Sequence, residues 1–340
     1  MSKQLEGKNM SLAGKISNES YLNRVMFLVL IALFGIASLT IGNYFSTATA
    51  LNLIANNWYI VILGVGVTFL LVSGHLDMSV GGIVAMAGVL SAYFCQPANE
   101  GFSELGQGLG MPYGVAIGLT LLCCLVIGAL NALFIAKMRV ASIIVTLGTM
   151  SIARGIGQMA ALGAQRSAGL PDIFDVIGNV PLFGPIKIAA AIAAILVIIA
   201  LYIEKNTTFG RRTYLIGANR EAARLSGIKV ERHIALLYLL SSLLAGITGI
   251  LLASEMKAGI STRGTGFEFS ALVVTLLGGA SIDGGVGSVL GMVIGAMILG
   301  VVSSAAYSML LRPEWQFILK ATVTFLAIIA QRYLLDRRSR

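Results

Sequence analysis

Residues 113–136 read YGVAIGLTLLCCLVIGALNALFIA, and this stretch contains no charged side chain. The hydrocarbon core of a bilayer is about 30 Å thick, which a helix of roughly 20 apolar residues can span. The stretch is long enough to do so, and its small residues would let a neighbouring helix approach closely. It therefore predicts a membrane-spanning helix, and its length is the measure by which the rest of the chain is divided into spans.

The whole chain has the same character. Of its 340 residues, 57% are hydrophobic and 11% are charged, whereas soluble domains carry about 25% charged residues. Its 40 glycines favour close helix packing in lipid. The net charge of +9 lies in tails and loops between apolar spans, so it does not indicate a nucleic-acid partner. We expect an all-α polytopic membrane protein in contact with membrane lipid.

Hydrophobic length divides the chain into about ten transmembrane helices. They are expected at 24–42, 51–73, 80–96, 113–136, 140–162, 186–203, 234–253, 268–282, 288–310 and 316–334. The third and eighth spans are short and interrupted by glycine, so they either cross the membrane fully or form re-entrant segments. Broken backbone is tolerated at membrane depth only where protein or a water-filled cavity surrounds it.

Basic residues predict the orientation of these spans. Most of the 24 Lys and Arg residues fall into the segments that face the cytoplasm if the N-terminus lies inside. No short apolar leader with a cleavage site precedes the first span. We therefore expect cytoplasmic tails at 1–23 and 336–340, and a single transmembrane domain at 24–335 with a cytoplasmic loop at 204–233. Two segments, 77–81 and 283–287, share the pattern D-x-x-V-G, which either reflects duplicated halves or arises by coincidence.

The loop EKNTTFGRRTYLIGANREAARLSGIKVERH, residues 204–233, is the longest polar stretch between spans. Its middle predicts a short helix that Asn219 or a neighbour caps and that Gly227 ends as a C′ residue. The small Ala222 and Ala223 would let one face press against another protein, and Arg220, Glu221 and Arg224 would supply polar edges. The alternative is a loop that only fixes topology.

Glu221-Ala222-Ala223 followed by Gly227 resembles the E-A-A-x-x-x-G signature of binding-protein-dependent ABC importer permeases. The proline that usually follows in the longer signature is absent. The context is similar to the ribose-type branch, as are four other segments in order along residues 50–330: 74–81, 146–150, 278–287 and 313–316. The resemblance implies an ATPase-coupling helix formed by Asn219, Arg220, Glu221, Ala222, Ala223, Arg224, Ser226 and Gly227.

The resemblance also implies the partners and the location. They are an ABC ATPase subunit, a periplasmic substrate-binding protein and a second permease subunit, as a homodimer or heterodimer, in the bacterial inner membrane. The implied cargo is a monosaccharide or a similar small polar solute, and a sister branch carries branched-chain amino acids. Two rivals from other classes stay open, an ion-coupled secondary transporter or channel without an ATPase and a structural membrane protein.

Several polar residues inside spans are candidates for the translocation pathway. Arg154 is a full charge within a span, which is costly in lipid, so it should face protein or water. It either lines the path or pairs with an acid such as Glu255 or Glu268. The other candidates either donate hydrogen bonds to a passing solute or join helices; they are Asn131, Thr146, Thr149, Ser151 and Gln158.

Two acidic residues at span junctions read as helix caps rather than as ion-coupling groups. Asp77 and Asp283 each precede a glycine-rich span start, where a carboxylate accepts backbone N–H bonds. No carboxylate is expected deep inside a span, as proton coupling would require. The chain has no G-x-x-x-x-G-K-[ST] phosphate loop and no hydrolase or metalloprotease motif. We expect no catalytic residue, no metal and no cofactor, and hence ATP hydrolysis on a partner.

Overall fold

The computed structural model describes residues 12–42, 44–98, 107–163, 165–312, 314–316, 318–323, 325–326 and 329. The fold is mostly helical. In chain order the first helices are α1 (Leu12–Thr40), α2 (Thr47–Asn56), α3 (Trp58–Val72), α4 (Val80–Cys95), α5 (Tyr113–Ala132), the one-turn π-helix η3 (Leu133–Lys137), α6 (Ser142–Ala161) and α7 (Ile173–Asn179). The later ones are α8 (Ile188–Asn206), α9 (Thr208–Ala218), α10 (Arg220–Leu225), α11 (Val230–Met256), α12 (Phe267–Leu277) and α13 (Val289–Ser308).

Four very short strands join the loops at one end of the helices. Strand β1 (Gln165–Arg166) pairs antiparallel with β4 (Gly259–Ile260), and β2 (Pro181–Phe183) pairs antiparallel with β3 (Ile186–Lys187). The first pair links the segment after α6 to the segment after α11. The second pair is a hairpin that leads from α7 into α8. These strands satisfy backbone groups in loops and build no sheet core.

In the described part of the chain, six helices are long and apolar enough to cross a membrane. They are α1 from Asn23, α5 with η3, α6, α8, α11 and α13. The pair α2 and α3, bent by 50° at its break, makes a seventh if it counts as one span. The fold is thus a polytopic helical membrane bundle, as the composition predicts.

The expected short spans are the short helices α4 and α12. At about 1.5 Å per residue, α12 is roughly 16 Å long, about half of the hydrocarbon thickness. Of the expected last span at 316–334, residues 316, 318–323, 325–326 and 329 are described and helical. Residues 1–11 and the C-terminal tail at 336–340 lie outside the described residues.

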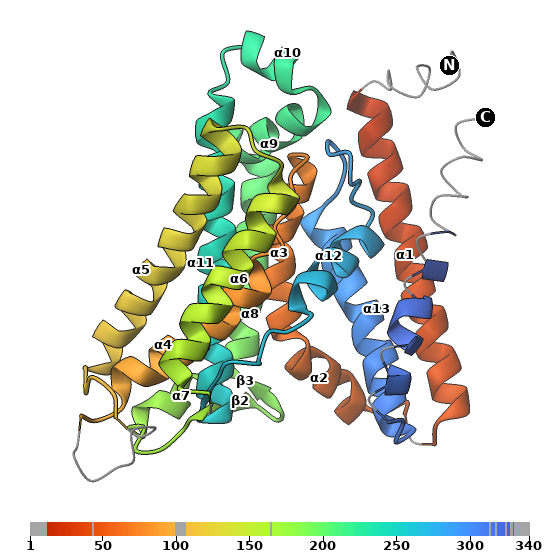
Figure 1. Cartoon of the computed structure of the whole chain (residues 1–340). Coiled ribbons are helices and arrows are strands. Elements are labelled where there is room, and N and C mark those ends of the chain that lie inside the picture. Colours follow the sequence, from red (N-terminus) through yellow and green to blue (C-terminus); the bar gives the residue numbers. More distant parts are fainter. Residues whose placement is uncertain are drawn as a thin grey trace.

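Helix α11 forms the centre of the bundle (Figure 1), with α3, α4 and α5 packed around it. Helix α1 lies at the periphery against α13. Large apolar side chains point outward from the peripheral helices, among them Leu28, Leu122, Ile144 and Ile198. Water would make such exposure costly, whereas lipid is as apolar as these side chains.

The two ends of the bundle carry different elements (Figure 1). Helices α9 and α10, the α3–α4 loop and the α12–α13 loop lie at one end. Helices α2 and α7 and the β2–β3 hairpin lie at the other. The long helices run between the two ends, so any signal from α10 must cross the bundle through packed helices.

Gly249 shows how tightly the central helices meet. A Cβ atom added there would lie 2.4 Å from the carbonyl oxygen of Val84 and 2.8 Å from Cβ of Ala87, on α4. Neither obstacle can rotate away, because one is backbone and the other is a β-carbon. The crossing of α11 over α4 therefore requires glycine at this position.

We predict that Gly249→Ala lowers the stability of the folded protein by about 1–3 kcal/mol, the usual cost of overpacking. The apparent melting temperature in detergent, followed by fluorescence-detected gel filtration, measures this. Gly118→Ala on α5 is the matched control, since an added Cβ there meets nothing within 4 Å. Equal melting temperatures for the two variants would contradict the close-packed crossing.

Candidate functional site

Helix α10 is the short capped helix expected in the loop. Asn219 Oδ1 accepts hydrogen bonds from the backbone N–H of Glu221 (3.1 Å) and of Ala222 (3.0 Å). Beyond the last residue of the helix, Gly227 has φ +80°, the left-handed conformation of a C′ glycine. Both predicted ends are confirmed, and with them the presence of a rigid helix of six residues.

The two alanines of α10 face different ways. Ala223 is buried against the rest of the chain, whereas Ala222 is exposed. The expectation that both belong to one docking face is therefore wrong, because a helix turns by about 100° between successive residues. Leu225, which the sequence reading passed over, is 83% exposed. The outward surface of α10 consists of Glu221, Ala222, Leu225 and Ser226.

The basic residues of α10 bind back to the chain. Arg224 forms an ion pair with Glu231 at the start of α11, and a second one with Glu221 at 3.6 Å. Arg220 Nη2 is buried, with no hydrogen-bond partner among the described residues. Burial and the nearby Arg220 cation lower the pKa of His75, in the α3–α4 loop, to about 4. Arg224 thus holds α10 against the start of α11, and Glu221 remains as the exposed charge of the helix.

At the same end of the bundle as α10, the loop that contains one D-x-x-V-G segment, residues 283–287, meets the end of α3. The backbone N–H of Gly285 donates to the carbonyl of Val72 at 2.7 Å, so the α12–α13 loop is bonded to the end of α3. Helix α9 closes over this contact at Gly217, where an added Cβ would lie 1.8 Å from the same Val72 oxygen. The end of α3, the α12–α13 loop and the last turn of α9 therefore form one continuous backbone contact.

The two acidic residues of these loops have different surroundings. Asp77 is buried; its Oδ1 accepts from the N–H of Ser79 (2.9 Å) and from the Ser79 hydroxyl (2.5 Å). Ser241 of α11 donates to Oδ2 at 2.7 Å. Asp77 therefore stabilises the turn before α4, close to the expected role. Asp283 is not a cap: its loop leads into α13, whose N-cap is Ser288, with a hydroxyl that accepts from the N–H of Gly291.

Three of the pathway candidates lie inside the bundle. Asn131 donates to the Ser79 hydroxyl at 3.0 Å and accepts from Thr149 at 2.6 Å, which extends the Asp77 network to α5 and α6. Thr146 is fully buried and donates to the carbonyl of Ser142. Asn131 and Thr149 therefore join helices, the second of the two readings that the sequence left open, whereas Thr146 bonds within α6.

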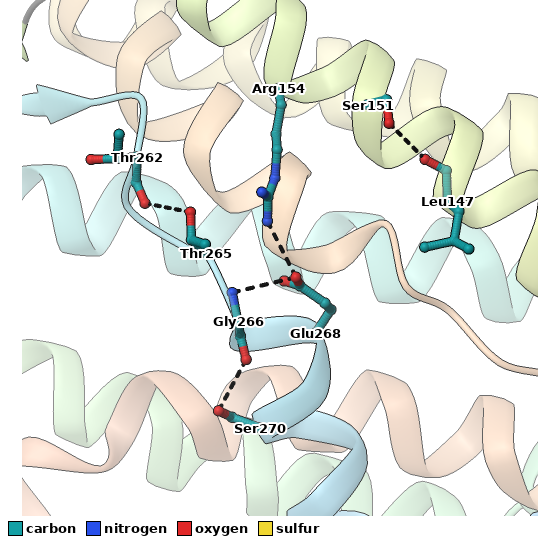
Figure 2. A network of polar contacts seen from close by, with 8 residues as sticks. All are labelled: Leu147, Ser151, Arg154, Thr262, Thr265, Gly266, Glu268 and Ser270. Carbon is teal, nitrogen blue, oxygen red and sulfur yellow. Dashed lines mark hydrogen bonds and ion pairs between the residues drawn. The ribbon is translucent and has the colours of Figure 1, made fainter. Parts of the chain in front are cut away.

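The other three candidates share the outer face of α6. Ser151 and Gln158 are exposed, and the guanidinium of Arg154 reaches Glu268 at the start of α12. Figure 2 shows this ion pair at 3.2 Å, with Glu268 Oε1 also accepting from the N–H of Gly266 at 3.3 Å. Glu268 Oε2 is buried and has no hydrogen-bond partner among the described residues. Arg154 is 27% exposed, so the pair is open on one side.

Three acidic residues in the described part of the chain are buried: Asp77, Glu204 and Glu268. Asp77 lies in the α3–α4 loop, and the other two lie near the end of α8 and near the start of α12. Each accepts hydrogen bonds from neighbouring groups, which offsets part of the cost of burial. Within the described residues, no group of three or more His, Cys, Asp or Glu side chains could hold a metal ion.

Comparison with known proteins places these features in a family. A family model described as "Branched-chain amino acid transport system / permease component" matches residues 49–328. The chain belongs to this permease family. The permease is similar to the ribose import permease protein of Haemophilus influenzae, at 30% identity over 311 residues that cover 91% of this chain and 92% of that protein.

Two further relatives come from Escherichia coli. The L-arabinose transport system permease protein is 35% identical over 313 residues, which cover 91% of this permease and 90% of that protein. The xylose transport system permease protein is 30% identical over 379 residues, with coverage of 93% and 94%. The resemblance to ribose-type importer permeases that the sequence motifs indicated is thereby confirmed.

Sequence reasoning missed two residues that bind the loops of this permease together, Glu204 and Tyr214. The Tyr214 hydroxyl lies 2.6 Å from Glu204 Oε1, and Glu204 also accepts from the N–H of Val289 at 3.1 Å. One signal was available, because Glu204 is the single acid of α8 and directly follows a long apolar run. Its partners could not be read from the sequence, since Val289 lies 85 residues further along the chain.

We predict that Arg154→Met destabilises the permease by about 3 kcal/mol, because it leaves the buried Glu268 carboxylate without its cation. The value lies at the low end of the range for buried pairs, since Arg154 is partly exposed. Adding Glu268→Gln removes the stranded charge, so the double variant should recover most of the lost stability. Melting temperatures in detergent measure both effects. A stable Arg154→Met protein that has lost only uptake would mean that Arg154 acts on the solute and not as a structural partner.

Proposed function

We propose that this permease is the membrane-spanning subunit of an ABC importer that carries a monosaccharide into the bacterial cell. Relatives that align along nearly the whole chain are named for ribose, L-arabinose and xylose. The description of the family names branched-chain amino acids, but these relatives favour a sugar. The chain has no phosphate-binding loop, so ATP hydrolysis takes place on a separate ATPase subunit.

The observation that carries the proposal is the form of α10. A capped helix held by the ion pair of Arg224 with Glu231 presents a small exposed surface around Leu225 at one end of the bundle. An exposed leucine beside an exposed carboxylate suits a groove on a partner protein. We place the ATPase contact there, with Asn219 and Gly227 fixing the ends of the helix and Ser226 at its edge.

Orientation follows from the charges at the same end. Nine of the basic residues in the described part of the chain gather around α9, α10 and the η3–α6 turn; they are Lys137, Arg139, Lys205, Arg211, Arg212, Arg220, Arg224, Lys229 and Arg232. By the positive-inside rule this end faces the cytoplasm. We propose ten crossings of the bacterial inner membrane, with α4 and α12 among them, and cytoplasmic tails at both ends of a single transmembrane domain.

The solute path in this proposal runs along the outer face of α6. Ser151, Arg154 and Gln158 lie there, where a second permease subunit, identical or different, would close the passage. The hydrogen-bonded Asn131, Thr146 and Thr149 support the wall behind it. A periplasmic substrate-binding protein would deliver the sugar at the opposite end, beside α7 and the β2–β3 hairpin.

An ion-coupled transporter is the second candidate, since three buried carboxylates are present. The structure favours it less, because Glu268 is paired with Arg154 and Asp77 is bonded to two serines. Purified permease in vesicles without ATPase separates the two functions. Uphill uptake of labelled ribose, arabinose or xylose driven by a proton or sodium gradient would overturn the ATP-driven proposal.

We predict that Leu225→Ala and Glu221→Ala each lower sugar uptake at least fivefold while the amount of permease in the membrane stays unchanged. The substitutions remove the exposed contact surface of α10 and leave the packed Ala223 in place. Uptake of the labelled sugars and co-purification with the ATPase subunit of the same transporter are the measurements. Leu122→Ala is the matched control, because this leucine is also exposed but lies on α5, away from α10. Unchanged uptake and co-purification in the α10 variants would rule out ATPase docking at this helix.

A further inference from the structure

A buried carboxylate joins the end of α8 to α9 and α13. Glu204 is 6% exposed, and its Oε1 lies 2.6 Å from the Tyr214 hydroxyl and 3.1 Å from the backbone nitrogen of Val289. Tyr214 lies on α9, which leads into α10 after a single residue, Asn219. A chain of short contacts therefore connects the helix before α10 with the first residue of α13.

The Tyr214 hydroxyl has a second acceptor in the α12–α13 loop. Its oxygen lies 2.6 Å from the carbonyl oxygen of Gly287 and at the same distance from Glu204 Oε1. A phenol carries one proton, so it can donate to one of these two oxygens at a time. The junction consequently has two hydrogen-bonded arrangements, one that favours the α8 carboxylate and one that favours the loop.

The N-terminus of α13 depends on the same junction. The Ser288 hydroxyl accepts a hydrogen bond from the N–H of Gly291, and the Glu204 carboxylate accepts one from the N–H of Val289. These two side chains therefore satisfy two of the backbone donors that a first helical turn leaves free. A carboxylate at this position is also favoured by the helix dipole. If Glu204 moves with α9, the first turn of α13 must follow or lose a buried hydrogen bond.

Helix α13 in turn packs against α12, which carries Glu268. An added Cβ on Gly295 of α13 would lie 2.2 Å from the carbonyl oxygen of Val274 on α12, which shows how closely the two backbones approach. Glu268 begins the same α12 and holds Arg154 on the outer face of α6. A displacement at Val289 can thus reach the proposed solute path through closely packed helices.

We propose that Tyr214 and Glu204 are positioning residues that transmit movement of α10 to α13 during transport. The inference rests on the proposed function, because it takes α10 as the place where the ATPase acts. It predicts that weakening the junction separates ATP hydrolysis from solute movement. A junction that only stabilised the fold would lower both activities together, in proportion to the amount of folded protein.

The test uses the whole transporter, reconstituted in vesicles with its ATPase subunits and its binding protein. ATP hydrolysis and uptake of labelled ribose, arabinose or xylose are measured on the same preparation. We expect Tyr214→Phe to retain at least half of the hydrolysis and to lose uptake at least fivefold. Tyr202→Phe is the matched control, since Tyr202 lies on α8 near Glu204 but is 64% exposed, and its ratio of uptake to hydrolysis should equal that of the wild type.

A second pair of variants covers the case in which Tyr214→Phe is poorly folded. Glu204→Gln keeps a side-chain oxygen for Tyr214 and Val289, so its ratio of uptake to hydrolysis should stay near the wild-type value. Glu204→Leu removes that acceptor and should behave like Tyr214→Phe. The inference is overturned if Glu204→Leu and Tyr214→Phe keep the wild-type ratio of uptake to hydrolysis, including the case in which uptake and hydrolysis fall in parallel. Failure of the wild-type complex to couple sugar uptake to hydrolysis would instead refute the proposed function.

Discussion

Inside a membrane, each backbone N–H and C=O group must find a partner in the protein, because lipid offers none. A continuous helix meets this requirement alone, and a broken one cannot. The chain is interrupted after α3 and after α12, and each interruption leaves free groups at one end of the bundle. The bond from Gly285 to Val72 pairs one group of each interruption with the other, and turns within the two loops satisfy further groups. The two interruptions are tolerated because the backbone of the α12–α13 loop bonds to the end of α3.

The same requirement governs the buried acids. Asp77 accepts from Ser79 and Ser241, and Glu204 lies against Tyr214 and the first turn of α13. Each network spans elements far apart in the chain, so each also fixes how the helices around α11 are placed. Polar residues that look like lining for a sugar path, Asn131 and Thr149 among them, belong to this internal framework.

The sequence predicted what depends on local chemistry. Apolar length located the spans to within a few residues at α5, α6 and α13, and the caps of α10 followed from Asn219 and Gly227. Contacts between distant segments were beyond its reach. Ser288 rather than Asp283 caps α13, because the cap depends on where the glycine-rich loop ends, which no spacing reveals. Whether Ala223 faces inward depends on how α10 packs against α11. Which backbone group bonds to Glu204 depends on where α13 begins relative to α8.

These observations together restrict how force from α10 could enter the membrane. The helix itself touches little of the bundle, but α9 before it contacts both broken loops through Gly217 and Tyr214. A pull on α10 therefore acts through α9 on the ends of α3 and α13, and through Arg224 and Glu231 on the start of α11. Close-packed interiors transmit such displacements because they have little room to absorb them. The glycines that allow the loops to approach this closely are thus part of the mechanical path, and side-chain bonds decide how stiff that path is.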